Sequence, residues 1–128
     1  MPAQSPEEIC RLFQRYMREG DIDSVMTLYD REAVFLNQAG QVRRGPAELR
    51  EELSPLAASR AIFEFENRRV VRAHDLALMH TRWTVTSSRR QLQLHAIEVA
   101  RRQPDGSWRW VIGDPFTVGS EVPTEALR

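Results

Sequence analysis

The chain has 128 residues, enough for one domain that buries an ordinary hydrophobic core without disulfides or metal ions. Its formal net charge is zero, so the charge balance gives no reason to expect nucleic acid or an anionic membrane as a partner. All 18 basic residues are arginine, which excludes any mechanism that proceeds through a lysine Schiff base.

The composition also indicates a cytoplasmic protein. Cys10 is the only cysteine, so no disulfide can form within the chain, and this fits a reducing compartment. No apolar stretch approaches the roughly 20 residues that a membrane span requires. The N-terminus lacks the basic and apolar regions of a signal peptide.

The first expected element is an amphipathic helix that begins after Ser5. Ser5 is a suitable N-cap, and Glu8, three residues later, completes a capping box. Apolar residues then recur at helical spacing, and Gly20 ends the helix. A second helix begins after Asp21 and includes Tyr29, so the two helices form a hairpin.

The remainder of the chain is predicted to be mostly strands. A short strand at 33–37 and a third helix from Gly45 to about residue 53 come first. Four longer strands follow at 62–74, 76–86, 91–102 and 108–114. Helices that are separate from an antiparallel meander predict an α+β fold, in which the helices cover one face of the sheet.

Alternation along the strands at 76–86 and 91–102 assigns their side chains to two faces. A two-residue loop at the tip of this hairpin would place odd residues of the first strand beside even residues of the second. The more apolar face is assigned to the interior, and it carries Met79, Thr81, Trp83, Val85, Leu92, Leu94, Ala96 and Glu98. Because a carboxylate is costly to bury, Glu98 should have a raised pKa or a specific partner.

Several segments resemble one known group of proteins. They read Leu-Phe-Gln-Arg-Tyr-Met at 12–17, Gly-Asp-Ile-Asp-Ser-Val-Met-Thr-Leu-Tyr at 20–29, Ala-Val-Phe-Leu-Asn at 33–37 and Ala-Ile-Glu-Val-Ala-Arg at 96–101. The chain therefore resembles the nuclear transport factor 2-like superfamily, which includes ketosteroid isomerases and SnoaL-like polyketide cyclases. The resemblance implies one SnoaL-like domain over residues 1–128, with a core at about 5–116 and a polar tail at 117–128. It also implies a strongly curved sheet that forms a cone-shaped pocket.

The resemblance also assigns roles to individual residues. Tyr16 stands where ketosteroid isomerases place the tyrosine of the oxyanion hole, and Glu98 stands where they place the protonated acid beside it. Asn37 occupies the position of their general base, and an amide cannot accept a proton at neutral pH. A classical steroid isomerase is therefore not expected. Asp114 lies near the acid of SnoaL-like cyclases and is a candidate base, although it could equally begin a turn before the following proline.

His80 and His95 are the alternative candidates for the base. They resemble the histidine pair of scytalone dehydratases, because both lie on neighbouring predicted strands. Strand alternation nevertheless places them on the outer face, where paired histidines are ordinary neighbours or interface residues, unless a bulge at 87–88 reverses the assignment. No metal site or other cofactor is expected, since the three histidines lack the carboxylate spacing of a metal site.

Two functions follow from these expectations. The first is an isomerase, dehydratase or cyclase that acts on a small apolar carbonyl compound through a tyrosine and an acid. The second is a non-catalytic module for small-molecule binding or dimerisation. The half-polar outer face of the sheet predicts a homodimer. The catalytic candidates are Tyr16, Glu98 and Asp114, and the predicted pocket lining is Phe35, Asn37, Met79, Thr81, Trp83, Leu94 and Ala96.

Overall fold

The computed structural model describes residues 2–118, so all but two residues of the expected polar tail at 117–128 lie outside the described residues. The helices are α1 (Pro6–Glu19), α2 (Ile22–Met26) and α3 (Gly45–Ala58). The strands are β1 (Tyr29–Leu36), β2 (Val42–Arg44), β3 (Ile62–Ala73), β4 (Leu76–Ser87), β5 (Arg90–Arg102) and β6 (Trp108–Asp114).

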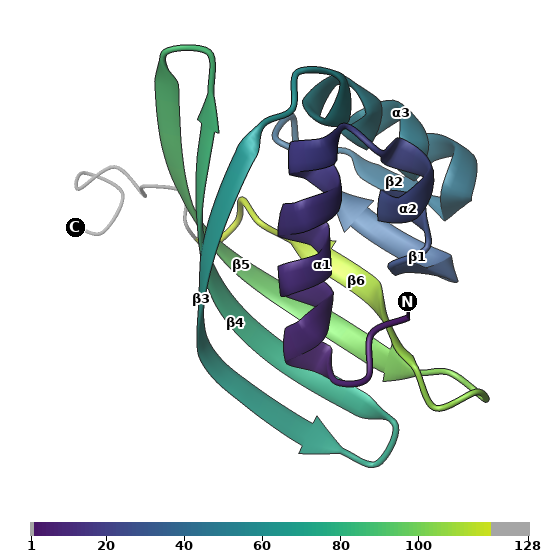
Figure 1. Ribbon diagram of the computed structural model, residues 1–128. Helices are drawn as coiled ribbons and strands as arrows, with labels where there is room; N and C mark the ends of the chain where they lie inside the picture. The colour runs from purple at the N-terminus through teal and green to yellow at the C-terminus, as the bar shows by residue number, and fades with distance from the viewer. Residues whose placement is uncertain (1, 119–128) are drawn as a thin grey trace.

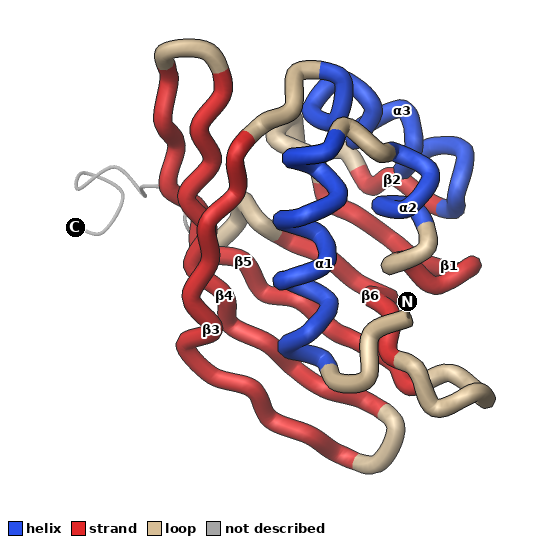
Figure 2. The backbone as a smooth tube through the Cα atoms, viewed as in Figure 1, coloured by secondary structure: helices blue, strands red, loops and turns tan. Residues whose placement is uncertain are grey.

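One curved sheet and three helices make up the described fold (Figure 1). The strand order is β2-β1-β6-β5-β4-β3, and every neighbouring pair is antiparallel except β1 and β6, which are parallel. The helices all lie on the concave side, with α1 across the sheet and α3 beside β1 and β2 (Figure 2). The predicted α+β fold with helices on one face of a curved sheet is confirmed.

Helix α1 begins and ends where its sequence predicts. The Ser5 side chain accepts a hydrogen bond from the backbone N–H of Glu8, and Gly20 closes the helix in the left-handed conformation with φ 70°. A Cβ atom at Gly20 would lie 3.2 Å from the carbonyl oxygen of Ala57. Glycine at this position therefore allows the end of α1 to approach α3 closely.

The second helix is shorter than predicted, and the first strand is longer. Helix α2 ends at Met26, and Tyr29 is the first residue of β1. The carbonyl oxygen of Leu28 accepts a hydrogen bond from the backbone N–H of Trp110, so sheet pairing begins at this point. Helical spacing at 22–29 could not reveal this pairing, because the partner lies more than 80 residues away in the sequence.

The third helix is longer than predicted, and β2 was not predicted. Helix α3 continues past residue 53 to Ala58, because Leu53 and Ala57 extend the buried face that Leu49 begins. Strand β2 has only three residues, and it pairs with β1 from Leu36↔Val42 to Val34↔Arg44. A strand this short shows too few alternations to be recognised from sequence.

The central hairpin has the predicted register. Ser87 pairs with Arg90, so the loop has two residues, and Met79 stands opposite Glu98. Strand β6 departs from simple alternation, because Val111 has no partner between the pairs Val99↔Ile112 and Ala100↔Trp110. This extra residue reverses the alternation, so that Gly113, and not Ile112, shares the inner face with Glu98.

An ion pair between the buried Asp30 of β1 and the partly exposed Arg101 of β5 connects these two strands. The carboxylate of Asp30 accepts hydrogen bonds from Arg101 Nη2 at 2.9 Å and Nε at 3.1 Å, and from Gln103 Nε2 at 2.9 Å. Burial alone would raise the pKa of Asp30, but the hydrogen bonds from Arg101, Gln103 and the Glu32 backbone outweigh it and lower the pKa to about 2. The ion pair thereby holds β1 in place, and the side chain of Tyr29, which precedes Asp30 in this strand, lies buried in the interior.

Candidate functional site

A cavity of about 270 Å³ lies between α3, the hairpin of β4 and β5, and the end of β6. Its volume is close to the lower limit of ligand pockets, which is about 300 Å³. Its wall is mostly apolar, and the aromatic members are Phe13, Tyr29, Phe35, Phe63, Trp83, Trp110 and Phe116. Leu92 and Gln38 are exposed lining residues and mark the open side, whereas Glu98 is buried at the inner end.

Glu98 is the buried acid of this cavity. Its Oε1 accepts a hydrogen bond from Thr81 Oγ1 at 2.8 Å, and its Oε2 accepts one from Trp83 Nε1 at 3.1 Å. Burial raises the pKa of Glu98 to about 7, and the two hydrogen bonds reduce that rise only in part. The predicted raised pKa and the predicted specific partners are thus both present. Near neutral pH, this carboxyl group can either hold a proton or release it.

A short polar chain supports Glu98 from behind. Asn67 Nδ2 donates to Thr81 Oγ1 at 3.0 Å and lies 3.5 Å from the sulfur of Cys10. Burial, and next the charge of Glu98, raise the pKa of the Cys10 thiol well above its ordinary value. Cys10 is therefore a protonated structural thiol and not a nucleophile. The hydrogen bond from Asn67 orients the hydroxyl of Thr81, because the oxygen accepts from Asn67 and the hydrogen is left to be donated to Glu98.

The alternation change in β6 leaves space beside Glu98. Gly113 stands directly opposite Glu98 in the register, and it also lines the cavity. A Cβ atom at Gly113 would lie 3.3 Å from Cδ2 of Phe35. Glycine thus lets the Phe35 ring pack against the strand next to the acid.

Two hydrogen-bond donors of the lining have no acceptor within residues 2–118. The hydroxyl of Tyr29 makes no hydrogen bond there, and the indole Nε1 of Trp110 is buried without a partner. Burial, and next the charge of Glu98, raise the pKa of Tyr29, so its phenol stays protonated. The tyrosine and tryptophan rings are neighbours, with centroids 5.4 Å apart. An oxygen of a ligand would satisfy such donors.

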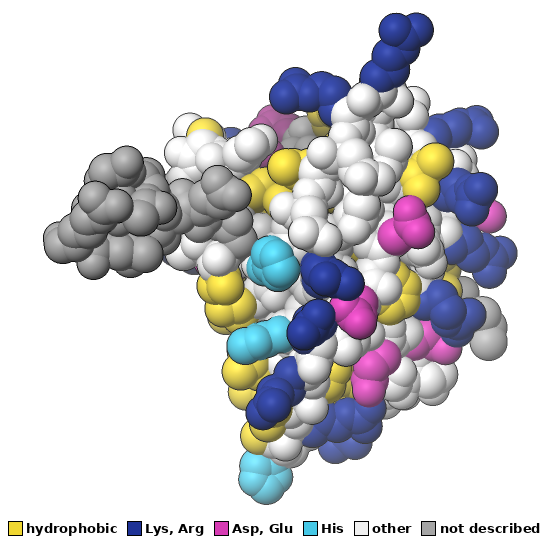
Figure 3. Space-filling view, turned by 90° about the vertical axis from the view of Figure 1, so that its left-hand side faces the viewer, with side chains coloured by type: hydrophobic (Ala, Val, Ile, Leu, Met, Phe, Trp, Pro, Cys, Tyr) yellow, Lys and Arg dark blue, Asp and Glu magenta, His cyan; other side chains and the backbone are white. Residues whose placement is uncertain are grey.

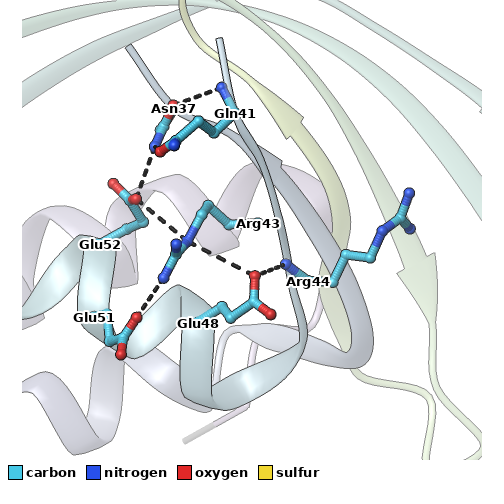
Figure 4. A network of polar contacts seen from close by, with 7 residues as sticks. All are labelled: Asn37, Gln41, Arg43, Arg44, Glu48, Glu51 and Glu52. Carbon is cyan, nitrogen blue, oxygen red and sulfur yellow. Dashed lines mark hydrogen bonds and ion pairs between the residues drawn. The ribbon is translucent and has the colours of Figure 1, made fainter. Parts of the chain in front are cut away.

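A second polar group of residues lies where β1 meets α3 (Figure 4). Asn37 Nδ2 donates to Glu52 Oε1 at 2.8 Å and to Gln41 Oε1 at 3.0 Å, and Asn37 Oδ1 accepts from the Gln41 backbone N–H at 2.8 Å. Arg43 Nε lies 3.4 Å from Glu52 Oε1, and its Nη2 contacts Glu51. Asn37 and Glu52 line the cavity, so this network forms part of its wall.

The structure places the predicted pocket residues in two groups. Phe35, Asn37, Trp83 and Leu94 line the cavity. Met79, Thr81 and Ala96 are buried on the same face of the sheet but belong to the packed core, and of these Thr81 contacts Glu98. Strand alternation identified the inner face, but it could not show how far the core fills that face.

Tyr16, a predicted catalytic residue, is half-buried and is not among the lining residues. It makes no hydrogen bond with Glu98, whose oxygens are bonded to Thr81 and Trp83. The phenol that lines the cavity belongs to Tyr29. The predicted pairing of Tyr16 with Glu98 stays a prediction, and Tyr29 is a competing candidate for the same role.

The three proposed alternatives for the base lie in different environments. Asp114 is at the edge of the cavity, but its Oδ1 accepts the backbone N–H groups of Phe116 and Thr117, as in the predicted turn. In the register, Asp114 pairs with Ile97 on the outer face. His80 and His95 are exposed on that face and do not line the cavity.

Sequence patterns alone do not identify Tyr29, Trp110 or Glu52 as site residues. Helical spacing places Tyr29 in the second helix, and Trp110 has only the pattern of a residue in the last strand. Glu52 lies three residues after Leu49 and four before Leu56, so helical spacing continued beyond residue 53 would have placed it on the inner face.

Within residues 2–118, no group of three or more histidine, cysteine, aspartate or glutamate side chains is placed to hold a metal ion. None of the described helices is both long enough and apolar enough to cross a membrane.

Comparison with known proteins identifies the family. The model of the SnoaL-like domain matches residues 9–111, and the chain therefore belongs to the SnoaL-like domain family. A search of curated proteins gives no match. The predicted membership of the nuclear transport factor 2-like superfamily is confirmed.

Solved structures show the same fold at low sequence identity. A protein from Thiobacillus denitrificans, provisionally named a calcium/calmodulin-dependent protein kinase type II association domain, is 18% identical with a TM-score of 0.75, covering 91% of this chain and 99% of that one. A provisionally named dehydratase of the NTF2-like family from Streptomyces avermitilis is 18% identical with a TM-score of 0.72, covering 87% and 93%. A ketosteroid isomerase-like protein from Erwinia carotovora atroseptica is 19% identical with a TM-score of 0.65, covering 84% and 88%.

The buried carboxyl of Glu98 makes stability depend on pH in a predictable direction. Because the pKa of Glu98 rises from 4.5 in the unfolded chain to about 7 on folding, its contribution to stability is complete below pH 4.5 and is lost as pH rises through 7. Glu98→Gln should therefore gain up to about 3 kcal/mol of unfolding free energy relative to wild type between pH 4.5 and pH 8.

Urea unfolding at intervals across this pH range measures the difference. Glu64→Gln, which changes an exposed glutamate of β3, is the control. The difference in unfolding free energy between this variant and wild type should not change with pH. A constant difference between Glu98→Gln and wild type over the whole range would show that Glu98 titrates normally.

Proposed function

We propose that the protein is an acid–base enzyme of the isomerase, dehydratase or cyclase type that acts on a small apolar carbonyl compound inside the cavity. The observation that carries this proposal is Glu98, an acid buried in the cavity wall with a pKa of about 7. A group that can hold or release its proton near neutral pH is what general acid–base catalysis requires. Such pKa values cluster at functional sites, because they need a specific environment to arise.

The proposed role of Glu98 is to donate a hydrogen bond or a proton to the oxygen of the substrate. In its protonated form the carboxyl is neutral, and the surrounding apolar wall favours that form. When negative charge develops on the oxygen, the interaction with the donor becomes stronger, and a mostly apolar wall makes this interaction stronger than it would be in water. Thr81 and Trp83 hold the carboxyl in place by hydrogen bonds to its two oxygens.

Tyr29 is proposed as the second donor to the same oxygen. Its raised pKa keeps the phenol protonated, and its hydroxyl has no hydrogen-bond partner within residues 2–118. The charge of Glu98 contributes to that raised pKa, so the two groups interact electrostatically. This assignment differs from the sequence-based role of Tyr16, and the two tyrosines are therefore compared directly in the experiment below.

The cavity also restricts the class of substrate. Its volume of about 270 Å³ suits a compound of one or two rings, and its aromatic wall suits an apolar body. No arginine or histidine is among its described lining residues, so a carboxylate or phosphate group would find no cation there. The substrate is thus proposed to be uncharged, with a carbonyl oxygen as its main polar group.

The alternative function is a binding module without catalysis. One observation favours this alternative. The side-chain amide of Asn37 is hydrogen-bonded to Gln41 and Glu52, and an amide cannot act as a base at neutral pH. In that case, Glu98 and Tyr29 would only bind the ligand oxygen.

Exchange of the α-hydrogens of 2-tetralone for deuterium in D₂O, followed by NMR, measures enolisation directly. Wild type should accelerate the exchange, and Glu98→Gln and Tyr29→Phe should each slow it by about 100-fold, because each variant weakens or removes a donor to the developing oxyanion. Tyr16→Phe is the matched control and should stay within about threefold of wild type.

The binding of 2-tetralone is followed separately by the fluorescence of Trp83 and Trp110, which line the cavity. Quenching without any exchange would favour the binding module and overturn the catalytic proposal. A loss of exchange in Tyr16→Phe, with full exchange in Tyr29→Phe, would return the phenol role to Tyr16.

We also propose that the protein forms a homodimer through the outer face of its sheet. Val71, Leu78, Val99 and Ile112 follow one another in register across β3, β4, β5 and β6. Of these, Val71, Leu78 and Ile112 have exposed fractions of 51%, 43% and 48%. Figure 3 shows apolar side chains beside histidines and arginines on this side of the molecule. A row of exposed apolar residues, unlike a single one, is typical of an interaction surface.

Sedimentation at micromolar concentration should give a dimer for wild type. Leu78→Arg should give a monomer, because it places a charge in the middle of the apolar row. Val42→Arg is the control, since Val42 is 50% exposed but lies on β2, away from the row, and it should leave the dimer intact. A monomeric wild-type protein would contradict the proposed dimer.

A further inference from the structure

Glu52 is an acid of the cavity wall whose carboxylate is held through one of its two oxygens. Its Oε1 accepts a hydrogen bond from Asn37 Nδ2 at 2.8 Å and lies 3.4 Å from Arg43 Nε. Its Oε2 makes no hydrogen bond within residues 2–118. One oxygen is thus fixed and the other is free to accept a proton. The side chain is 26% exposed, so it is neither sealed in the core nor fully in solvent.

We infer that Glu52 is the catalytic base of the cavity, and that its free carboxylate oxygen removes a proton from the carbon next to the carbonyl group of the substrate. This inference rests on the proposed function and adds the proton acceptor to it. The other acids suit this role less well. Glu98 has both oxygens bonded within the wall. Asp114 lies at the edge of the cavity, and the register pairs it with Ile97 on the outer face of the sheet.

The position of Glu52 is set by contacts from two elements. Helix α3 presents its inner face to the cavity, and Leu53 and Leu56 of that face line the cavity with Glu52. From the turn that follows β1, Asn37 holds Glu52, and the orientation of Asn37 is fixed because its Oδ1 accepts a hydrogen bond from the backbone N–H of Gln41. Figure 4 shows Asn37 and Arg43 approaching the same carboxylate. A base held in this way keeps its geometry while its free oxygen reacts.

Glu52 lies beside one cation, Arg43, which it shares with two other carboxylates. Arg43 lies between Glu48, Glu51 and Glu52, so its single positive charge is shared among three carboxylates. Glu98, in contrast, is buried in the mostly apolar wall of the cavity and has no cationic partner within residues 2–118. Two carboxyl groups of one cavity in such different environments are typical of a base and an acid that act together.

An independent observation indicates that a ligand oxygen belongs in the same cavity. Trp110 is only 3% exposed, it lines the cavity, and its indole Nε1 has no acceptor within the described chain. A buried donor without an acceptor is costly, and the acceptor oxygen of a bound ligand would remove that cost. The cavity therefore offers a donor for an oxygen as well as a base for a C–H group.

The proposed proton transfer needs neither an oxidant nor a reductant. Glu52 Oε2 takes the proton from the α-carbon, the electron pair of the C–H bond forms the carbon–carbon double bond of an enolate, and the carbonyl pair moves to oxygen. Glu98 and Tyr29 donate hydrogen bonds to that oxygen. Glu52 then returns the proton to the same carbon or to another carbon of the enolate, which restores both the carboxylate and the carbonyl group.

Glu52→Gln tests this role, and Glu51→Gln is its matched control. Both variants remove one carboxylate from Arg43, but only Glu52 lines the cavity. Deuterium exchange of 2-tetralone should fall by at least about 100-fold in Glu52→Gln and stay within about threefold of wild type in Glu51→Gln. Quenching of tryptophan fluorescence by 2-tetralone should be unchanged in both variants, since the base does not bind the ligand oxygen.

A second variant separates the loss of the base from a loss of folding. In Glu52→Ala, added formate should restore exchange in proportion to its concentration, whereas formate should have no effect on wild type. Full exchange in Glu52→Gln would overturn the role of Glu52 and leave the proposed function intact, provided that Glu98→Gln still slows exchange as expected. No exchange in wild type would overturn both.

Discussion

The properties of this site depend on one constraint, the burial of the carboxyl group of Glu98. Glu98 is buried in the mostly apolar wall of the cavity, and within residues 2–118 only Thr81 and Trp83 donate hydrogen bonds to its oxygens. This environment raises the pKa of the carboxyl to about 7, at the expense of folding stability above that pH. Nothing in a purely structural role requires an acid there, because an apolar residue would pack in the same place without the cost of desolvation.

The architecture brings this acid into a cavity by a few local departures from regular structure. The unpaired Val111 in β6 turns Gly113 toward the interior, and the absence of a side chain at Gly113 lets Phe35 approach. The parallel pairing of β1 with β6 places Tyr29 beside Trp110. Helix α3 forms one side of the cavity with Leu53, Leu56 and Glu52, so that polar groups stand at both ends of an otherwise apolar space.

Local sequence patterns predicted the features that depend on local chemistry. The caps of α1 and the two-residue hairpin followed from residue types and from alternation, and so did the inward direction of Glu98. The features that depend on distant contacts could not be predicted in this way. Tyr29 has helical spacing with its neighbours, and it joins a strand only because Leu28 pairs with Trp110 across the sheet. Similarly, Asn37 indicates a missing base when read alone, and the carboxylate beside it comes from another element, 15 residues further along the chain.

The most direct test of the account is the titration of Glu98 itself by carbon-13 NMR of glutamate side-chain carboxyl groups. The resonance that disappears in Glu98→Gln identifies the group. This resonance should titrate with a pKa of about 7 in the free protein, because desolvation outweighs the hydrogen bonds from Thr81 and Trp83. A pKa near 4.5, the ordinary value for glutamate, would contradict the central claim that the cavity holds a protonatable acid at neutral pH.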